Sequence, residues 1–386
     1  MMGIRTITLA LAVVILTVAT VGAQTTSIFT TGLNFPNKIV NAGEGSLLVS
    51  EAGTAAPNTG RISLIDRATG ARRTLIDGLP SGVNNLGGSP APAGPSGLKL
   101  HGRILYVTIA AGDAVQNEAG VEVPSAIPSS PIYDSVLELT LPGDYETATS
   151  PFTLPFNGQT TMADGGVMTL TNADDQKLEI RLVANFPDYA APKASNIFGV
   201  ELFQKHLYVI DAAFNLVYEV DIETGVFSTF ATFAPKPNSL PFGPPMVEAV
   251  PTSIHREGNQ LNITYLTGFP FGPGVAEVHR LSLKDQSQST LITGLRSAID
   301  SMHVRNEDGS VSYYTLEFSA NQLGTPNPPN ANIPVPGVLK YFATADSAPV
   351  IVNNTMLFPT SMARDDTTGD LFVTNIFLGR VTRVQF

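Results

Sequence analysis

The segments Pro251-Thr252-Ser253-Ile254 and Pro359-Thr360-Ser361-Met362 decide the fold, because their pattern recurs six times along the chain. Each copy reads as a proline or isoleucine, a further residue that is usually polar or small, a small or polar residue and an aliphatic residue. A supersecondary unit repeated in this way is typical of propellers and other repeat architectures. The remaining copies are Pro36-Asn37-Lys38-Ile39, Pro95-Ser96-Gly97-Leu98, Ile197-Phe198-Gly199-Val200 and Ile299-Asp300-Ser301-Met302.

A second β-strand follows each copy and usually ends at a polar residue. The intervening hairpins carry turn residues such as Gly43-Glu44-Gly45 and Thr368-Gly369-Asp370. Third and fourth strands follow in most copies, so each repeat predicts one four-stranded blade around an innermost strand. The second strands end at Glu51, Ile109, Asp211, Tyr265, Glu317 and Asn375.

The sixth copy lacks its outer strand because the chain ends at Phe386. The segment Ser27 to Leu33 precedes the first inner strand and resembles the fourth strands of the other copies. Pairing these two ends removes the exposed edges of an open array. The sequence therefore predicts an all-β protein, a six-bladed β-propeller of four-stranded blades, closed by an N-terminal strand that completes the last blade. The longest insertions, Pro151 to Asp175 and Ala320 to Pro336, are expected to be loops of this single domain.

The N-terminus has the layout of a secretory signal peptide, with Arg5, an apolar run and small residues before Gln24. We expect cleavage after Ala23, which gives a signal peptide over 1–23 and a propeller domain over 24–386. An uncleaved membrane anchor is the alternative. The expected product is an exported monomer, periplasmic or extracellular, with no membrane contact after cleavage.

Composition excludes several kinds of function. The chain has 34 glycines and 29 prolines, and only 14 % of its residues are charged. It has no cysteine, which excludes disulfides and thiolate-bound metals. The net charge of −11 argues against nucleic acid as a partner.

The fourth copy carries a family resemblance. It reads Val250-Pro251-Thr252-Ser253-Ile254, then Leu266-Thr267-Gly268-Phe269-Pro270-Phe271, then Ala276-Glu277-Val278-His279-Arg280-Leu281. This block resembles the ScyD/ScyE family of exported propellers, and Ser195 to Val200 and Gly94 to Leu98 support the resemblance. The resemblance spans nearly all of the mature chain. It implies a six-bladed propeller related to NHL-repeat and gluconolactonase-like proteins, but it supplies no reaction. The chain departs from the family pattern at Tyr265, where members usually have an acidic residue.

A ring of polar residues is expected at the mouth of the central channel, where second strands end and inner strands begin. Inner-strand starts place Asn37, Ser96, Thr252, Asp300 and Thr360 there. Carboxylate and amide oxygens suit a hard divalent cation such as calcium, and the resemblance to gluconolactonase-like propellers implies a metal in a comparable place. The candidate ligands are Glu51, Asp211, Glu317 and Asn375. The alternative is that each residue hydrogen-bonds turn backbone at the end of its strand.

Two histidines, His255 and His303, occupy the same register in neighbouring inner strands. They are candidates to share a ligand or a proton. The alternative is a pair of structural histidines bonded to backbone carbonyls.

Two functions remain open at this stage. The first is a binding or accessory scaffold that holds a small molecule or a protein at the loop-rich face. The second is a metal-dependent lactonase-like hydrolase, in which a divalent ion polarises a carbonyl and a ring carboxylate, His255 or His303 acts as the base. Tyr265 and the apolar Ile109 weaken the second, because they interrupt the ring of ligands.

Overall fold

The computed structural model describes residues 24–43, 45–54, 56–86, 90–320 and 336–386. The predicted signal peptide lies outside the described residues. Within the described part of the chain, no helix is both long enough and apolar enough to span a bilayer.

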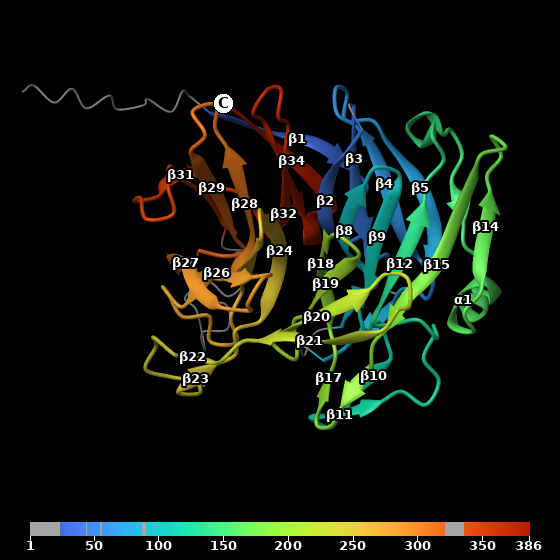
Figure 1. The fold of residues 1–386 in the computed structure, drawn as a ribbon, viewed down its shortest axis with the longest axis horizontal. Helices are drawn as coiled ribbons and strands as arrows, with labels where there is room; N and C mark the ends of the chain where they lie inside the picture. Colours follow the sequence, from blue (N-terminus) through green and yellow to red (C-terminus); the bar gives the residue numbers. More distant parts are fainter. Residues whose placement is uncertain (1–23, 44, 55, 87–89, 321–335) are drawn as a thin grey trace, which may run out of the picture.

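Six antiparallel sheets form the predicted blades, and their inner strands contact one another in a closed ring (Figure 1). The first three blades consist of β2 (Pro36–Ala42), β3 (Ser46–Glu51), β4 (Gly60–Asp66) and β5 (Arg72–Leu79); β8 (Pro95–His101), β9 (Ile104–Ile109), β12 (Ser135–Thr140) and β15 (Lys177–Asn185); and β18 (Ile197–Phe203), β19 (His206–Asp211), β20 (Leu216–Asp221) and β21 (Phe227–Thr232).

The last three blades follow the same order. They consist of β24 (Pro251–Glu257), β25 (Gln260–Tyr265), β26 (Ala276–Ser282) and β27 (Gln288–Leu295); β28 (Ala298–Arg305), β29 (Val311–Glu317), β30 (Val338–Phe342) and β31 (Val350–Asn353); and β32 (Pro359–Arg364), β33 (Leu371–Asn375), β34 (Arg380–Gln385) and β1 (Thr25–Thr31). The predicted closure is confirmed, because β1 pairs antiparallel with β34, and the blue strand lies beside the red one in Figure 1.

The hydrophobic core is divided among the blade interfaces. The described residues form six clusters of buried side chains, and each cluster joins the facing sides of two neighbouring blades. The cluster that contains Ile39, Leu47 and Phe372, for example, joins the first blade to the last. Burial of apolar surface therefore holds the ring closed as well as each blade together.

Every inner strand begins with the same irregularity. Its first residue pairs with the last residue of the second strand, as Pro36 does with Glu51, and the register then shifts. In the second blade the inner strand lies so close to the next blade that a Cβ on Gly97 would overlap the carbonyl oxygen of Phe198. This steric requirement explains the glycine of the second copy, and four of the other five copies also have glycine or serine at this position.

The end of the propeller where inner strands begin is called the loop face below. Connections there are long and include the strand pairs β6 (Gly82–Asn84) with β7 (Ala91–Ala93), β10 (Val115–Glu118) with β11 (Val121–Pro124), β16 (Tyr189–Ala190) with β17 (Lys193–Ala194), and β22 (Lys236–Pro237) with β23 (Met246–Val247). In Figure 1 the strands β10, β11 and β17 are labelled at the bottom, and β22 and β23 at the lower left.

The insertion expected as a loop over Pro151 to Asp175 is partly ordered into regular structure. It forms β13 (Phe152–Thr153), the helix α1 (Phe156–Ala163) and β14 (Val167–Thr171). The strand β13 adds to the first blade in parallel, and β14 adds to the second blade. The insertion thus extends two blades at their outer edges. Two short 3-10 helices, Tyr145–Thr147 and Ile376–Leu378, complete the elements.

Candidate functional site

The predicted ring residues at the ends of the second strands are buried and bonded within their own blades. Glu51 accepts a hydrogen bond from the backbone N–H of Asn34, and Glu317 accepts one from Arg296 at 2.9 Å. Asp211 accepts one from the backbone N–H of Asn196 at 3.2 Å. Each bond fixes the backbone just before the inner strand of the same blade.

Asn375 has the same role with the opposite polarity, since its side-chain amide donates to the carbonyl of Leu357 at 2.8 Å. Cationic side chains complete two of the other sites, because Arg61 pairs with Glu51 and Lys340 pairs with Glu317. Among the described residues, no group of three or more His, Asp or Glu side chains is placed to hold a metal ion. The four residues predicted as calcium ligands lie in four separate blades. The side chain of each forms a hydrogen bond with the connecting backbone of its own blade.

Tyr265 occupies the equivalent position in the fourth blade and is 1 % exposed. Its ring stacks on His279 with centroids 5.2 Å apart, and burial raises its pKa above the ordinary value. Ile109, in the second blade, is fully buried. Both residues belong to the core.

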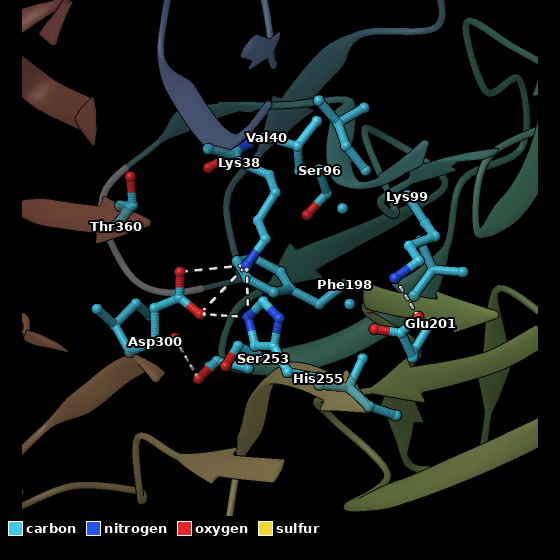
Figure 2. A pocket seen from close by; sticks show the side chains of 18 residues that line it. Lys38, Val40, Ser96, Lys99, Phe198, Glu201, Ser253, His255, Asp300 and Thr360 are labelled. Carbon is cyan, nitrogen blue, oxygen red and sulfur yellow. Dashed lines mark hydrogen bonds and ion pairs between the residues drawn. The ribbon is translucent and has the colours of Figure 1, made fainter. Parts of the chain in front are cut away.

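The central channel is lined by residues of all six inner strands, with about 550 Å³ of empty space, open solvent included. Figure 2 shows Lys38 extending from the first blade across this channel to Asp300 and His255. The ammonium nitrogen of Lys38 lies 3.1 Å and 3.2 Å from the two carboxylate oxygens of Asp300. It lies 3.2 Å from Nε2 of His255, which is itself 3.0 Å from Oδ1 of Asp300.

Asp300 is the most heavily bonded carboxylate of this site. Besides Lys38 and His255, it accepts hydrogen bonds from the backbone N–H groups of Ser301 and Met362 and from the hydroxyl of Ser361. Burial alone would raise its pKa, but the charge of Lys38 and the hydrogen bonds outweigh burial and hold the pKa well below the ordinary range. Asp300 is therefore ionised at neutral pH and links four blades.

Three polar atoms of residues that line the channel have no hydrogen-bond partner among the described residues. The hydroxyl of Ser96 is buried, with 1 % of the residue exposed, and is left unpaired. Nδ1 of His255 lies on the side of the ring turned away from Asp300 in Figure 2. The side-chain oxygen of Asn37 is free because only its amide nitrogen is used, in a bond to the carbonyl of Pro95.

The other channel charges are also neutralised. Lys99 pairs with Glu201, which also accepts hydrogen bonds from the backbone of Leu202 and Arg256. With Lys38 paired to Asp300, the residues lining the channel carry no net formal charge when His255 is neutral.

His303 is separated from the cluster of Lys38, His255 and Asp300. No hydrogen bond joins it to His255 among the described residues, and it is half-buried. Burial lowers its pKa, so the ring is neutral at pH 7.

Three residues of the channel were missed by sequence reasoning: Lys38, Lys99 and Glu201. A signal for two of them was present, because Lys99 and Glu201 occupy the inner-strand register of His255 and His303 in the second and third blades. Lys38 stands where the other copies have glycine or serine. This departure from the repeat pattern was the sequence signal that could have identified Lys38 as a channel residue.

Comparison with known proteins supports the fold. No protein-family model matches the chain, and no curated protein matches it in sequence. Among solved structures, a protein of unknown function from Bacteroides thetaiotaomicron has a TM-score of 0.51 at 10 % identity, with 94 % of this chain and 76 % of that chain covered.

Two further solved structures are similar in the same way. An auxiliary nutrient binding protein from Bacteroides thetaiotaomicron has a TM-score of 0.50 at 10 % identity, over 92 % of this chain and 69 % of that one. A gluconolactonase from Xanthomonas campestris has a TM-score of 0.49 at 10 % identity, over 94 % and 90 %. At 10 % identity, the two matches with TM-scores of 0.51 and 0.50 concern the fold alone. The six sheets of the structure give the chain the architecture of a six-bladed β-propeller.

Proposed function

We propose that this protein is a binding scaffold that holds a small uncharged molecule, rich in hydroxyl or carbonyl groups, in the mouth of its central channel. The observation that carries the proposal is the unpaired hydroxyl of Ser96 in a cavity that also presents Nδ1 of His255. A buried hydroxyl without a partner costs about 1–3 kcal/mol. A ligand atom that bonds it recovers this free energy, which makes the group a source of affinity.

The chemistry of the wall agrees with this ligand class. Phe198, Leu98 and Ile254 supply apolar surface, and the few polar atoms around them supply orientation, as in most small-molecule sites. The resemblance of the fourth blade to the ScyD/ScyE propellers is part of the same proposal, since an accessory binding role needs no catalytic group.

The experiment uses the mature chain and a panel of monosaccharides, polyols and sugar lactones, with binding followed by saturation-transfer NMR and calorimetry. Ser96→Ala is the decisive variant. We expect it to raise the free energy of unfolding by about 1 kcal/mol, because it removes an unsatisfied hydroxyl, and to weaken ligand binding about tenfold. Ser312→Ala changes a buried serine that lies outside the channel and serves as the control. A Ser96→Ala variant with unchanged affinity would refute the proposal.

A hydrolase is the second candidate, because Asp300 holds the His255 ring at 3.0 Å through Nε2 and leaves Nδ1 directed into the channel. In this function Nδ1 takes a proton from water as the water attacks a lactone carbonyl, and it returns the proton to the ring oxygen as the acyl C–O bond of the lactone breaks. Among the described residues, no group of three or more His, Asp or Glu side chains is placed to hold the divalent cation considered from the sequence. Lactone hydrolysis that survives in the His255→Gln variant would exclude this candidate.

A further inference from the structure

A second cavity lies on the loop face between the first and last blades and has a different chemistry. It is called the Phe377 groove here and is lined chiefly by Phe35, Pro90, Pro92, Ile376, Phe377 and Leu378. Its volume is about 570 Å³, and it is open to solvent. The channel site described above contributes none of its lining residues.

The floor of the groove is a fixed backbone junction. The N–H of Leu33 donates to the carbonyl of Gly379 at 3.0 Å. Gly379 has a φ of 56°, and a Cβ there would overlap the carbonyl oxygen of Leu33. Only glycine fits this approach of the two segments, so the groove is held open by the ring closure itself.

One wall presents an aromatic side chain that the fold leaves uncovered. The ring of Phe377 is 54 % exposed and Leu378 is 39 % exposed. Phe377 stands perpendicular to Phe35, with centroids 5.6 Å apart, and to Phe358, with centroids 4.9 Å apart. These edge contacts fix its orientation while its remaining surface stays in water. Covering a phenylalanine side chain fully is worth about 1.5–3 kcal/mol, so the exposed ring is a reserve of binding free energy.

The charge of the groove selects its ligand. None of the eleven described residues that line it has an ionisable side chain, whereas the whole chain carries a net charge of −11. An ionic group would lose its hydration there without gaining a partner. The volume matches the range of small-molecule sites.

We propose that the Phe377 groove binds an uncharged small molecule that bears a planar aromatic ring. The ring packs against Phe377 and Phe35, and the two prolines cover its other side. This site is independent of the channel site, because it uses other residues and another chemistry.

The probe is N-phenyl-1-naphthylamine, an uncharged aromatic fluorophore, titrated into the mature protein. We expect saturable binding at one site, weakened at least tenfold by Phe377→Ala. Phe156→Ala is the matched control, because Phe156 on α1 is also 54 % exposed. Far-UV circular dichroism checks that both variants fold.

Three outcomes would overturn the proposal. They are binding that does not saturate, an equal loss of affinity in Phe156→Ala, and binding of the anionic analogue 1-anilinonaphthalene-8-sulfonate that is as tight as that of the neutral probe. The variant Phe35→Leu, which keeps apolar volume but removes one ring, should also weaken binding severalfold. Ser96→Ala should leave probe binding unchanged, so the channel site and the Phe377 groove can be tested separately.

Discussion

Asp300 is expected to be the most costly single carboxylate to remove from this protein. Its carboxylate accepts hydrogen bonds from Lys38, His255, Ser301, Ser361 and Met362, which belong to four of the six blades. The variant Asp300→Asn keeps the shape of the side chain but leaves the ammonium of Lys38 without a counter-charge.

The magnitude follows from burial. Asp300 has 1 % of its side chain exposed and Lys38 has 15 %. Removal of one partner from a buried ion pair costs about 3–5 kcal/mol. Because Lys38 still reaches channel water, we expect the lower end, about 3 kcal/mol. In the cycle with Lys38→Met, the double variant should lose at least about 1 kcal/mol less than the sum of the single variants.

The assay is urea unfolding at pH 7. The chain has no tryptophan and ten tyrosines, so tyrosine fluorescence and far-UV circular dichroism are the two probes, and their transitions should coincide. Asp366→Asn is the control, because Asp366 pairs with Arg364 on the surface and has 88 % of its side chain exposed. Its loss should cost less than about 1 kcal/mol.

The pH dependence has a definite sign. The pKa of Asp300 is lower in the folded state than in the unfolded chain, so its contribution is present above the unfolded pKa of about 3.9 and is lost as pH falls through the folded pKa. The difference between wild type and Asp300→Asn should therefore be constant from about pH 5 to pH 7 and shrink below about pH 4. A cost under about 1 kcal/mol, or additivity in the cycle, would refute the reasoning.

Three other predictions concern the ring, a buried acid and metal binding. Gly97→Ala should destabilise the protein by about 1–3 kcal/mol in urea unfolding, because its methyl group overlaps the carbonyl of Phe198, while Gly45→Ala, with open space around it, should not. Asp134→Asn should stabilise the protein by about 1–3 kcal/mol at pH 7, because burial raises the pKa of Asp134 well above its ordinary value and one carboxylate oxygen has no partner. The gain should be smaller near pH 4, since the folded state of wild type keeps the proton that the unfolded chain releases above that pH; a gain independent of pH would contradict this assignment. Chelation should leave the melting temperature unchanged, whereas a rise on addition of calcium chloride would support the cation site predicted from the sequence.

The blade repeat could be predicted from the sequence because sterics restrict the start of each inner strand. Gly97 lies against the backbone of the next blade, and five of the six copies have glycine or serine at this position, with Lys38 as the exception. The insertion over Pro151 to Asp175 was harder to predict. The helix α1 within it is only eight residues long and contains Gly158, so its helical signal is weak.

The site could be predicted only in part. The ring positions of Glu51, Asp211 and Glu317 followed from the repeat, but each accepts a hydrogen bond from a backbone N–H group, and a pattern of side chains does not reveal such a partner. The reach of Lys38 across the channel depends on the distance between blades that are far apart in sequence. The repeat indicates only that Lys38 differs from the glycine or serine at the equivalent position of the other copies, and it does not reveal the contact that Lys38 makes.

The pairing of Thr25 with Gln385 has a consequence for biosynthesis. A ribosome makes β1 before any blade exists and makes its partner β34 last, so the first strand must wait in solution for almost the whole of translation. The unpaired strand is polar enough to stay in water during this time. Four of its residues remain exposed even in the folded protein: Thr25, Thr26, Ser27 and Thr31. The ring can close only after β34 has also been made, so the pairing of β1 with β34 comes late in folding.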